Sequence, residues 1–224
     1  MNDGGSLQLG DSNDSFIRFL DEVDDVLYLG THRDGLLDLD QRVFEAGSGL
    51  VDLLAALRRH QVMTSDGCLL SGEEAMQINS ARPFADCLTT DVKGERQFVL
   101  YDDIVLTQQD IRSVQLAKAA IQSGMMLLLE QAVVSVEDIQ ELYVAGVFGG
   151  FVNPGSAKQM GLLPSIDDKK IIFVGNAAGK GAGEALCDPK FIDMLQEHIA
   201  DIHHIELAEQ AKFTQVYMDS MEIA

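Results

Sequence analysis

The chain has 224 residues, of which 46% are apolar and 23% charged, and its formal net charge is −20. This is the composition of an ordinary globular protein, and no apolar run approaches the roughly 20 residues that a membrane-spanning helix needs. Because nucleic acids and anionic membranes bind basic surfaces, the charge argues against both as partners, and the acidic first residues lack the basic region of a secretory signal, so we expect a cytoplasmic protein.

The first forty residues carry the weakest structural signal. Residues 1–15 are rich in Gly, Ser, Asp and Asn, so we expect them to be mobile in part. Residues 16–39 fit a short helix, a strand and a turn. We therefore predict a divergent, partly mobile N-terminal segment over 1–40. Residues 41–224 contain neither a repeat nor a long linker, which indicates one domain.

A helix is predicted after Gly47-Ser-Gly49, because four leucines then recur at helical spacing. Asp66-Gly67 predicts a tight turn, and Ser71-Gly-Glu-Glu74 predicts the start of another helix. Residues 97–106 alternate weakly between polar and apolar, which indicates one strand or a kinked pair of strands.

A long helix is predicted over residues 107–131. Thr107 and Asp110 match a capping box, in which the side chains of the N-cap residue and of the third helical residue each bond to the backbone N–H of the other. Its core face is expected to consist of apolar residues at spacings of three and four: Ile111, Val114, Ala117, Ile121, Met125 and Leu128. Lys118 and Arg112 are expected to be solvated and not catalytic.

Two glycine-rich turns follow apolar strands in the second half of the chain. A strand over 142–145 leads into Gly146-Val-Phe-Gly-Gly150, and a strand over 170–175 leads into Gly175-Asn-Ala-Ala-Gly-Lys-Gly181. Buried parallel strands have this pattern, and glycines followed by a helix N-terminus let a ligand approach the backbone. We therefore expect the functional site at these two turns.

The second turn only partly matches known phosphate loops. The P-loop pattern is G-x-x-x-x-G-K-[ST], whereas here the first glycine lies one residue too close to Lys180, and Gly181 replaces the hydroxyl residue that would hold magnesium. The G-x-G-x-x-G spacing of dinucleotide folds is also absent. The small residues of 177–185 instead predict a helix that packs closely against a neighbour, with a phosphate contact from Lys180 as an open alternative.

Three further elements complete this half of the chain. Asn153-Pro154 predicts a helix that ends near Gly161, and Asp188-Pro189 predicts another. Residues 203–207 indicate an edge strand, and residues 213–221 a final helix.

Residues for catalysis or metal binding do not stand out. Cys68, Cys87 and Cys187 are far apart and cannot supply four thiolates, so we predict no iron–sulfur cluster in this chain. The five histidines lack metal-ligand spacing, and no serine lies in a nucleophile elbow. We therefore predict no metal site and assign no catalytic residue.

The order of these elements resembles the second lobe of an actin-like ATPase, an α/β, ribonuclease H-like fold with a mixed sheet and packed helices. Many sugar and acetate kinases match at this level. Four stretches are more specific and resemble the C-terminal actin-like (ASKHA) ATPase domain of the reductive activators of corrinoid-dependent methyltransferases. They are residues 103–121, Tyr143-Val-Ala-Gly-Val-Phe-Gly-Gly150, Ser156-Ala157 with Gly161-Leu-Leu-Pro164, and Val174-Gly-Asn-Ala-Ala-Gly-Lys-Gly-Ala-Gly183, with Gly47-Ser-Gly-Leu-Val-Asp52 upstream. The resemblance covers about 40–215.

The resemblance implies a site for ATP or ADP, with Mg²⁺ accompanying the nucleotide. It assigns the adenosine turn to Gly146, Phe148, Gly149 and Gly150. It assigns the turn that opens the hinge helix to Gly175, Asn176 and Gly179, beside Lys180. The family's phosphate loop and ferredoxin cysteines are missing, Ala46 stands where Cys is usual, and Val147 stands where Ala is usual.

These departures limit the expected function. Family members use ATP to drive an electron from a ferredoxin-like domain to the inactive cobalt(II) corrinoid. Without groups for the phosphates, this chain alone is expected to hydrolyse ATP poorly or not at all. The expected partners are a corrinoid protein or corrinoid methyltransferase, and a separate ferredoxin or first-lobe chain. The alternative is a non-enzymatic interaction module that kept the fold and lost nucleotide binding, with a homodimer as one form that it could take.

Overall fold

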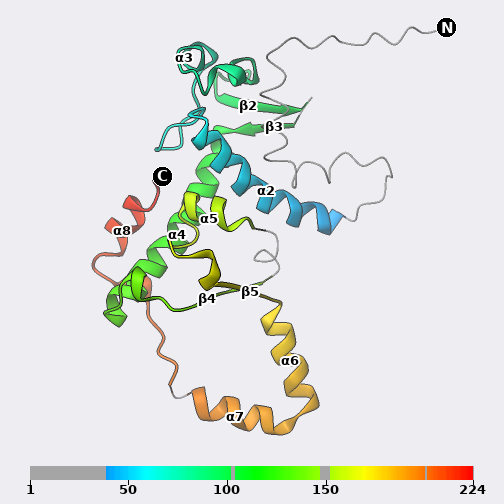
Figure 1. The fold of residues 1–224 in the computed structure, drawn as a ribbon, viewed down its shortest axis with the longest axis vertical. Helices are drawn as coiled ribbons and strands as arrows, with labels where there is room; N and C mark the ends of the chain where they lie inside the picture. Colours follow the sequence, from blue (N-terminus) through cyan, green and yellow to red (C-terminus); the bar gives the residue numbers. More distant parts are fainter. Residues whose placement is uncertain (1–38, 102–103, 147–151, 200, 224) are drawn as a thin grey trace, which may run out of the picture.

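The computed structural model describes residues 39–101, 104–146, 152–199 and 201–223. The elements in chain order are α2 (Leu39–Arg59), α3 (Gly72–Met76), η1 (Arg82–Cys87), β1 (Leu88–Thr90), β2 (Arg96–Tyr101), β3 (Ile104–Thr107), α4 (Gln108–Ala132), η2 (Val136–Asp138), β4 (Leu142–Ala145), α5 (Pro154–Met160), η4 (Asp168–Lys170), β5 (Ile171–Gly175), α6 (Ala177–Cys187), α7 (Pro189–Ile199), η5 (Leu207–Glu209) and α8 (Phe213–Asp219). Figure 1 shows α2, α4 and the antiparallel strands in one body, with α6 and α7 extending away from it.

Helix α2 begins earlier than the sequence predicts. It starts at Leu39 and runs through Gly47-Ser-Gly49, which was expected to precede it. A glycine inside a helix costs only about 1 kcal/mol, so two of them do not end a helix that tertiary packing supports. The helix therefore crosses the predicted boundary at residue 40, and the elements predicted over 16–38 lie outside the described residues.

The antiparallel sheet has the order β1-β2-β3. Phe98 in β2 pairs with Leu88 of β1 and with Leu106 of β3, so three apolar residues meet across the sheet. The pairing of β2 with β3 shifts register between Val99 and Tyr101. Residues 97–106 thus form the kinked pair that was one of the two predicted alternatives, whereas β1 was not predicted.

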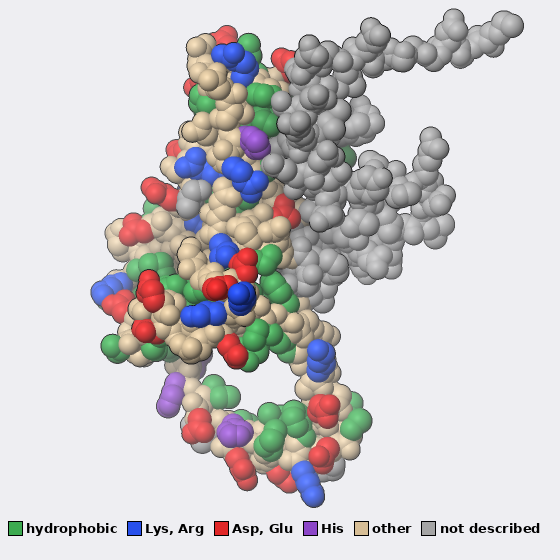
Figure 2. Space-filling view, viewed as in Figure 1, with side chains coloured by type: hydrophobic (Ala, Val, Ile, Leu, Met, Phe, Trp, Pro, Cys, Tyr) green, Lys and Arg blue, Asp and Glu red, His purple; other side chains and the backbone are tan. Residues whose placement is uncertain are grey.

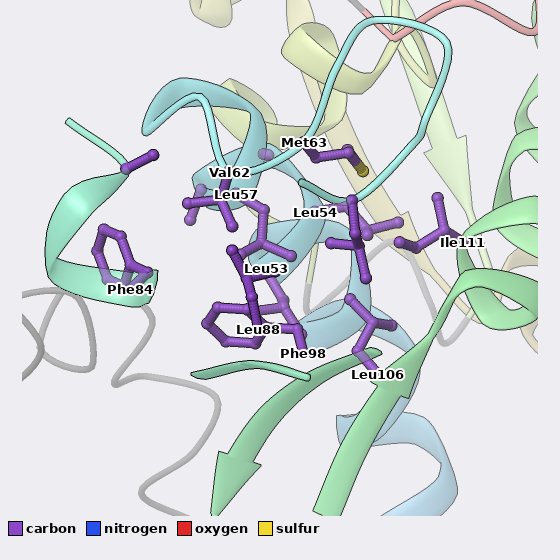
Figure 3. Close-up of a cluster of buried hydrophobic side chains, with 14 of the residues drawn as sticks. Leu53, Leu54, Leu57, Val62, Met63, Phe84, Leu88, Phe98, Leu106 and Ile111 are labelled. Atoms are coloured by element: carbon purple, nitrogen blue, oxygen red, sulfur yellow. The ribbon is translucent and has the colours of Figure 1, made fainter. Parts of the chain in front are cut away.

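The main hydrophobic core lies between α2, η1, the antiparallel sheet and the start of α4. Figure 3 shows side chains from all of these elements pointing toward one another. The largest fully buried apolar residues of this cluster are Leu54, Leu57, Met63, Leu69, Phe84, Phe98, Ile111, Met160 and Ile223. The leucine face predicted for residues 50–57 is therefore confirmed as core, with Leu50 at its partly buried edge.

Helix α4 has the predicted cap but a different buried face. The Asp110 backbone N–H donates to Thr107 Oγ1 at 3.1 Å, and the Thr107 N–H donates to the Asp110 carboxylate at 2.9 Å. Of the predicted face, Ile111 is buried and Val114 packs against the core, whereas Ile121 and Leu128 are 49% and 50% exposed. The buried residues of the helix are Ile111, Gln115, Lys118, Ala119, Ser123, Gly124 and Leu127.

The prediction that Lys118 is solvated is wrong, because its side chain is only 2% exposed. Its Nζ donates to the backbone carbonyl of Ser220 at 2.6 Å and to that of Glu222. Gln115 Nε2 donates to the carbonyls of Asp66 and Met221, each at 3.0 Å. The C-terminal segment therefore packs on α4 through polar side chains, and this explains why an apolar periodicity indicates the wrong face.

A separate sheet of two parallel strands, β4 and β5, lies beyond this body. Helix α5 lies between them in sequence, and as predicted it is capped by Asn153 and ends at Gly161. The edge strand predicted over 203–207 does not form, since these residues pair with no other described strand. The final helix, α8, is present. None of the described helices is both long and apolar enough to span a bilayer.

Candidate functional site

The two glycine turns predicted as the functional site lie side by side. Strands β4 and β5 run parallel with Leu142 opposite Ile171, so both end at the same edge of their sheet. The backbone N–H of Gly146, just after β4, donates to the carbonyl of Gly175, the last residue of β5, at 2.8 Å. Ligands of open α/β sheets bind at this carboxyl edge of the strands.

Both of these glycines need their residue type for conformational reasons. The φ angles are 99° at Gly146 and 64° at Gly175, a region that other residues adopt only with strain. A Cβ added at either position would have no heavy atom within 4 Å. The glycines are therefore not required by crowding within the described chain, and each turn has an open side that a ligand can approach.

The second turn continues into α6 through a side-chain cap. Asn176 Oδ1 accepts from the backbone N–H of Gly179 at 2.8 Å, which satisfies one of the free N–H groups of the helix start. A Cβ at Gly179 would lie 2.5 Å from Asn176 Nδ2, so glycine there lets the cap close. This pair explains the Asn-x-x-Gly part of the motif by local structure alone.

Lys180 is exposed, and its side chain bends back toward the strand. Its Nζ donates to the carbonyl of Val174 at 3.2 Å. The ammonium group therefore lies beside the end of β5, within the same turn as Gly175 and Asn176. The alternative of a phosphate contact from Lys180 stays a prediction.

The remaining predicted site residues are Phe148, Gly149 and Gly150, which lie outside the described residues. The structure thus brings five of the eight predicted positions to one edge of the β4–β5 sheet: Gly146, Gly175, Asn176, Gly179 and Lys180. Sequence reasoning did not anticipate the hydrogen bond between Gly146 and Gly175. The two strand-to-glycine patterns are nonetheless the signal from which their proximity could be inferred.

The prediction that the small-residue helix packs closely against a neighbour is wrong for the described chain. Helix α6 has no buried residue, and Cβ atoms added at Gly181 and Gly183 would meet nothing within 4 Å. Its main contact among the described elements is with α7. Close packing of such a helix requires another backbone to approach its glycines, and none of the described elements approaches Gly181 or Gly183 within 4 Å of an added Cβ.

Two polar contacts lie on or beside the strands that carry the site. The Tyr143 hydroxyl on β4 donates to the carboxylate of Glu141, and this hydrogen bond together with the carboxylate charge raises the pKa of Tyr143. Lys170 Nζ donates to the carbonyl of Ile139, which ties the start of β5 to the segment before β4. Neither contact forms an acid–base pair that could act on a bound ligand.

The described residues fit part of a nucleotide only. The open glycine turns fit the nucleoside, because backbone can approach it without a Cβ in the way. Within the described ranges, no group of three or more His, Cys, Asp or Glu residues could hold a metal ion.

Two adjacent glycine turns at one edge of a parallel sheet, with a small-residue helix after the second, are features of an ASKHA-type lobe. The profile of a family described as "C-terminal domain of RACo the ASKHA domain" matches residues 43–224. The chain belongs to this family. The predicted α/β, actin-like lobe and the resemblance to reductive activators are thereby confirmed.

Two curated relatives are similar to the chain. "Corrinoid activation enzyme RamQ" of Eubacterium limosum is 34% identical over 180 residues, which cover 77% of this chain and 30% of the relative. "[Co(II) methylated amine-specific corrinoid protein] reductase" of Methanosarcina barkeri is 26% identical over 124 residues, 54% of this chain and 23% of the relative.

A solved structure has the same fold. "Reductive activator for corrinoid,iron-sulfur protein" superposes with a TM-score of 0.67 and 31% identity over 79% of this chain and 28% of that one. The chain therefore spans less than a third of the length of the proteins that it matches.

Proposed function

We propose that this chain is the nucleotide-binding lobe of a cytoplasmic ATP-dependent system that reductively activates a corrinoid protein. The observation that carries the proposal is the hydrogen bond from Gly146 to Gly175, which joins two glycine turns whose Cβ sides are open. The names of the two relatives, which refer to corrinoid activation and to reduction of a corrinoid protein, support the same function.

The chain acts in this proposal with a partner and not as a complete ATPase. When bound, ATP supplies the free energy that drives one electron onto cobalt(II) to give cobalt(I). The electron comes from a separate ferredoxin, and a separate first-lobe chain is the candidate source of the phosphate-binding groups. This chain binds the adenosine through its glycine turns, and the partner supplies the groups that contact the phosphates. The corrinoid protein or corrinoid methyltransferase is the final partner.

Nucleotide binding is tested by calorimetry of the purified chain with ATP and with ADP at up to millimolar concentration. The test variant is Gly146→Leu, and the control is Gly94→Leu, because both glycines have positive φ and open space around a Cβ. We expect both variants to lose similar stability by backbone strain, and only Gly146→Leu to lose nucleotide binding, because its side chain would occupy the site.

Two outcomes contradict the proposal. If the unmodified chain does not bind millimolar ATP or ADP, the alternative of an interaction module without a ligand is favoured. Steady ATPase activity of the chain alone, lost on substitution of Gly149 by a bulky residue, would show that no partner is needed for hydrolysis.

A further inference from the structure

The last four described residues of the chain, 220–223, are held more closely than the segment before them. We call these four residues the C-terminal anchor. Ile223 is fully buried in the main core, and Ser220 is 4% exposed. Residues 201–219, by contrast, are all exposed or only partly buried, and α8 has no buried residue. Burial at this end of the chain is therefore concentrated in the C-terminal anchor.

The C-terminal anchor is held mainly through its backbone. Side chains of α2 and α4 donate to all four of its carbonyls: Lys118 to two of them, Gln115 to one and Arg58 to the last. The N–H of Ile223 donates in turn to the carbonyl of Ser65 at 2.8 Å. Main-chain hydrogen bonds give affinity for many sequences, whereas a side-chain pocket gives specificity. Here the specificity comes from the buried position of Ile223.

The residues that receive the C-terminal anchor are joined to one another by contacts of their own. Gln115 Nε2 also donates to the carbonyl of Asp66 at 3.0 Å. Gln108 of α4 donates to the carbonyl of Gly67 at 2.6 Å and accepts from the N–H of Leu69 at 3.0 Å. A Cβ at Gly67 would lie 2.6 Å from Gln115 Nε2, so glycine there leaves room for this side chain. Helix α4 and the turn are therefore connected without the anchor.

A weakly held segment connects the C-terminal anchor to the rest of the chain. Residues 201–206 contain no helix or strand, and all but Ile205 are exposed. Figure 1 shows this segment leading from α7 toward α8, and Figure 2 shows an open gap beside it, between α7 and the rest of the molecule. Helix α8 then lies against α4, where Lys212 pairs with Glu130 on the surface. Opening of such exposed segments costs less free energy than opening of the core.

We propose that the C-terminal anchor is an internal peptide ligand, from whose binding site α8 and the anchor dissociate as a unit while α2, α4 and the antiparallel sheet stay folded. Arg58, Ser65, Gln115 and Lys118 form this peptide-binding site. It takes the end of a short helix that is followed by consecutive free carbonyls and by an apolar residue at the position of Ile223. The same segment supplied by another molecule therefore binds there. This inference goes beyond the proposed function, because none of these residues belongs to the candidate site.

The test uses the full chain with the recognition sequence of a site-specific protease inserted between His203 and His204, in the exposed segment. Cleavage of the folded protein breaks the connection to α8 and leaves the C-terminal fragment in place, so we expect both fragments to elute together in size-exclusion chromatography. A fluorescent peptide of residues 213–224 should then exchange into the cleaved protein, measured by anisotropy. The uncleaved chain should bind this peptide about tenfold or more weakly, because the attached anchor competes at a high effective concentration.

Two pairs of variants test the contacts. Ile223→Asp in the peptide should weaken binding by about tenfold or more, because a carboxylate would enter an apolar pocket. Met218→Asp is the matched control, since Met218 is 55% exposed on α8, and this peptide should bind as the unmodified one does. In the cleaved protein, Lys118→Met should weaken binding by about tenfold, because two carbonyls lose their donor, whereas Arg112→Met should not.

Circular dichroism of the cleaved protein, after the fragment is removed by repeated dilution and concentration, shows whether the remainder stays folded. The inference is overturned if the remainder unfolds when the fragment leaves, or if the cleaved protein does not take up the unmodified peptide. It is also overturned if the Ile223→Asp and Met218→Asp peptides bind equally well, or if cleaved and uncleaved chains bind the peptide equally. No nucleotide is present in this assay, so its outcome is independent of the calorimetric test of nucleotide binding.

Discussion

At the scale of single residues, Lys118 of α4 connects two parts of the chain that are distant in sequence. It is a buried cation whose Nζ donates to two backbone carbonyls just after α8. Burial lowers the pKa of Lys118, and the nearby carboxylate of Glu222 partly opposes this change. Because these carbonyls follow the C-terminal end of α8, the positive charge of Lys118 also interacts favourably with the dipole of α8. The C-terminal segment is therefore fastened to α4 by a charged group.

We predict that Lys118→Met lowers the free energy of unfolding by about 2 kcal/mol. The methionine fills the space but leaves the carbonyls of Ser220 and Glu222 without their donor, and a buried unpaired acceptor costs about 1–3 kcal/mol. Urea denaturation measures the effect. Arg112→Met on the exposed side of the same helix is the control and should change the value by less than about 0.5 kcal/mol. Equal effects of the two substitutions would contradict the role of Lys118.

At the scale of elements, the bounds of α5 are set by a side-chain cap at its start and a glycine at its end. Asn153 Oδ1 accepts from the backbone N–H groups of Gly155 and Ser156, at 2.8 and 3.2 Å, and starts the helix. Gly161 ends it with φ of 76°. Helix α5 packs against α2, where Gln159 Nε2 donates to the carbonyl of Ala55 at 3.1 Å. The short helix therefore links the core to the segment that leads into β5.

We predict that Gly161→Ala destabilises the chain more than Gly94→Ala. Both glycines have positive φ, so each alanine introduces a strain of about 1–2 kcal/mol. At Gly94 the added Cβ meets nothing within 4 Å, whereas at Gly161 it would lie 2.9 Å from Gln122 Oε1 and 3.0 Å from Lys118 Cε. Overpacking adds about 1 kcal/mol or more at Gly161.

Thermal unfolding of the two alanine variants measures this difference. If the two variants lose the same stability, the side chains of α4 can move aside at the end of α5. That result would contradict close packing between Gly161 and α4.

At the scale of the whole molecule, burial is uneven. The core joins α2, the antiparallel sheet and the start of α4, and α8 packs against α4 farther along. The β4–β5 sheet and the two helices after it contribute few buried residues: Ile171 is the most buried of the sheet, at 9% exposure, and α6 has none. The candidate site therefore lies in the less buried part of the chain.

We predict that backbone amides of α6 exchange with deuterium much faster than those in the middle of α4. Opening α6 exposes little apolar surface, so its free energy of opening is small, whereas opening α4 disrupts the core. Hydrogen exchange followed by mass spectrometry of peptides measures both helices in one experiment, with the denatured chain as the reference. Similar protection of α4 and α6 would show that α6 is stabilised by contacts absent from the described structure.

The sequence by itself determined the features whose partners lie within a few residues. The capping box of Thr107 and Asp110, the cap at Ser71, and the αL end of α5 at Gly161 each depend on hydrogen bonds between neighbours in sequence. The two strand-to-glycine patterns are also local, and together with residues 103–121 and 156–164 they carried the resemblance to the family.

Only the tertiary structure decided which faces and side chains have distant partners. Lys118 and Gln115 look like surface residues because their acceptors, the carbonyls of residues 220–222, lie about a hundred residues away. The same packing turns Ile121 toward solvent. The hydrogen bond between Gly146 and Gly175 and the exposed faces of the β4–β5 sheet likewise follow from how strands pair in space. Local chemistry sets where elements begin and end, whereas burial depends on what packs against them.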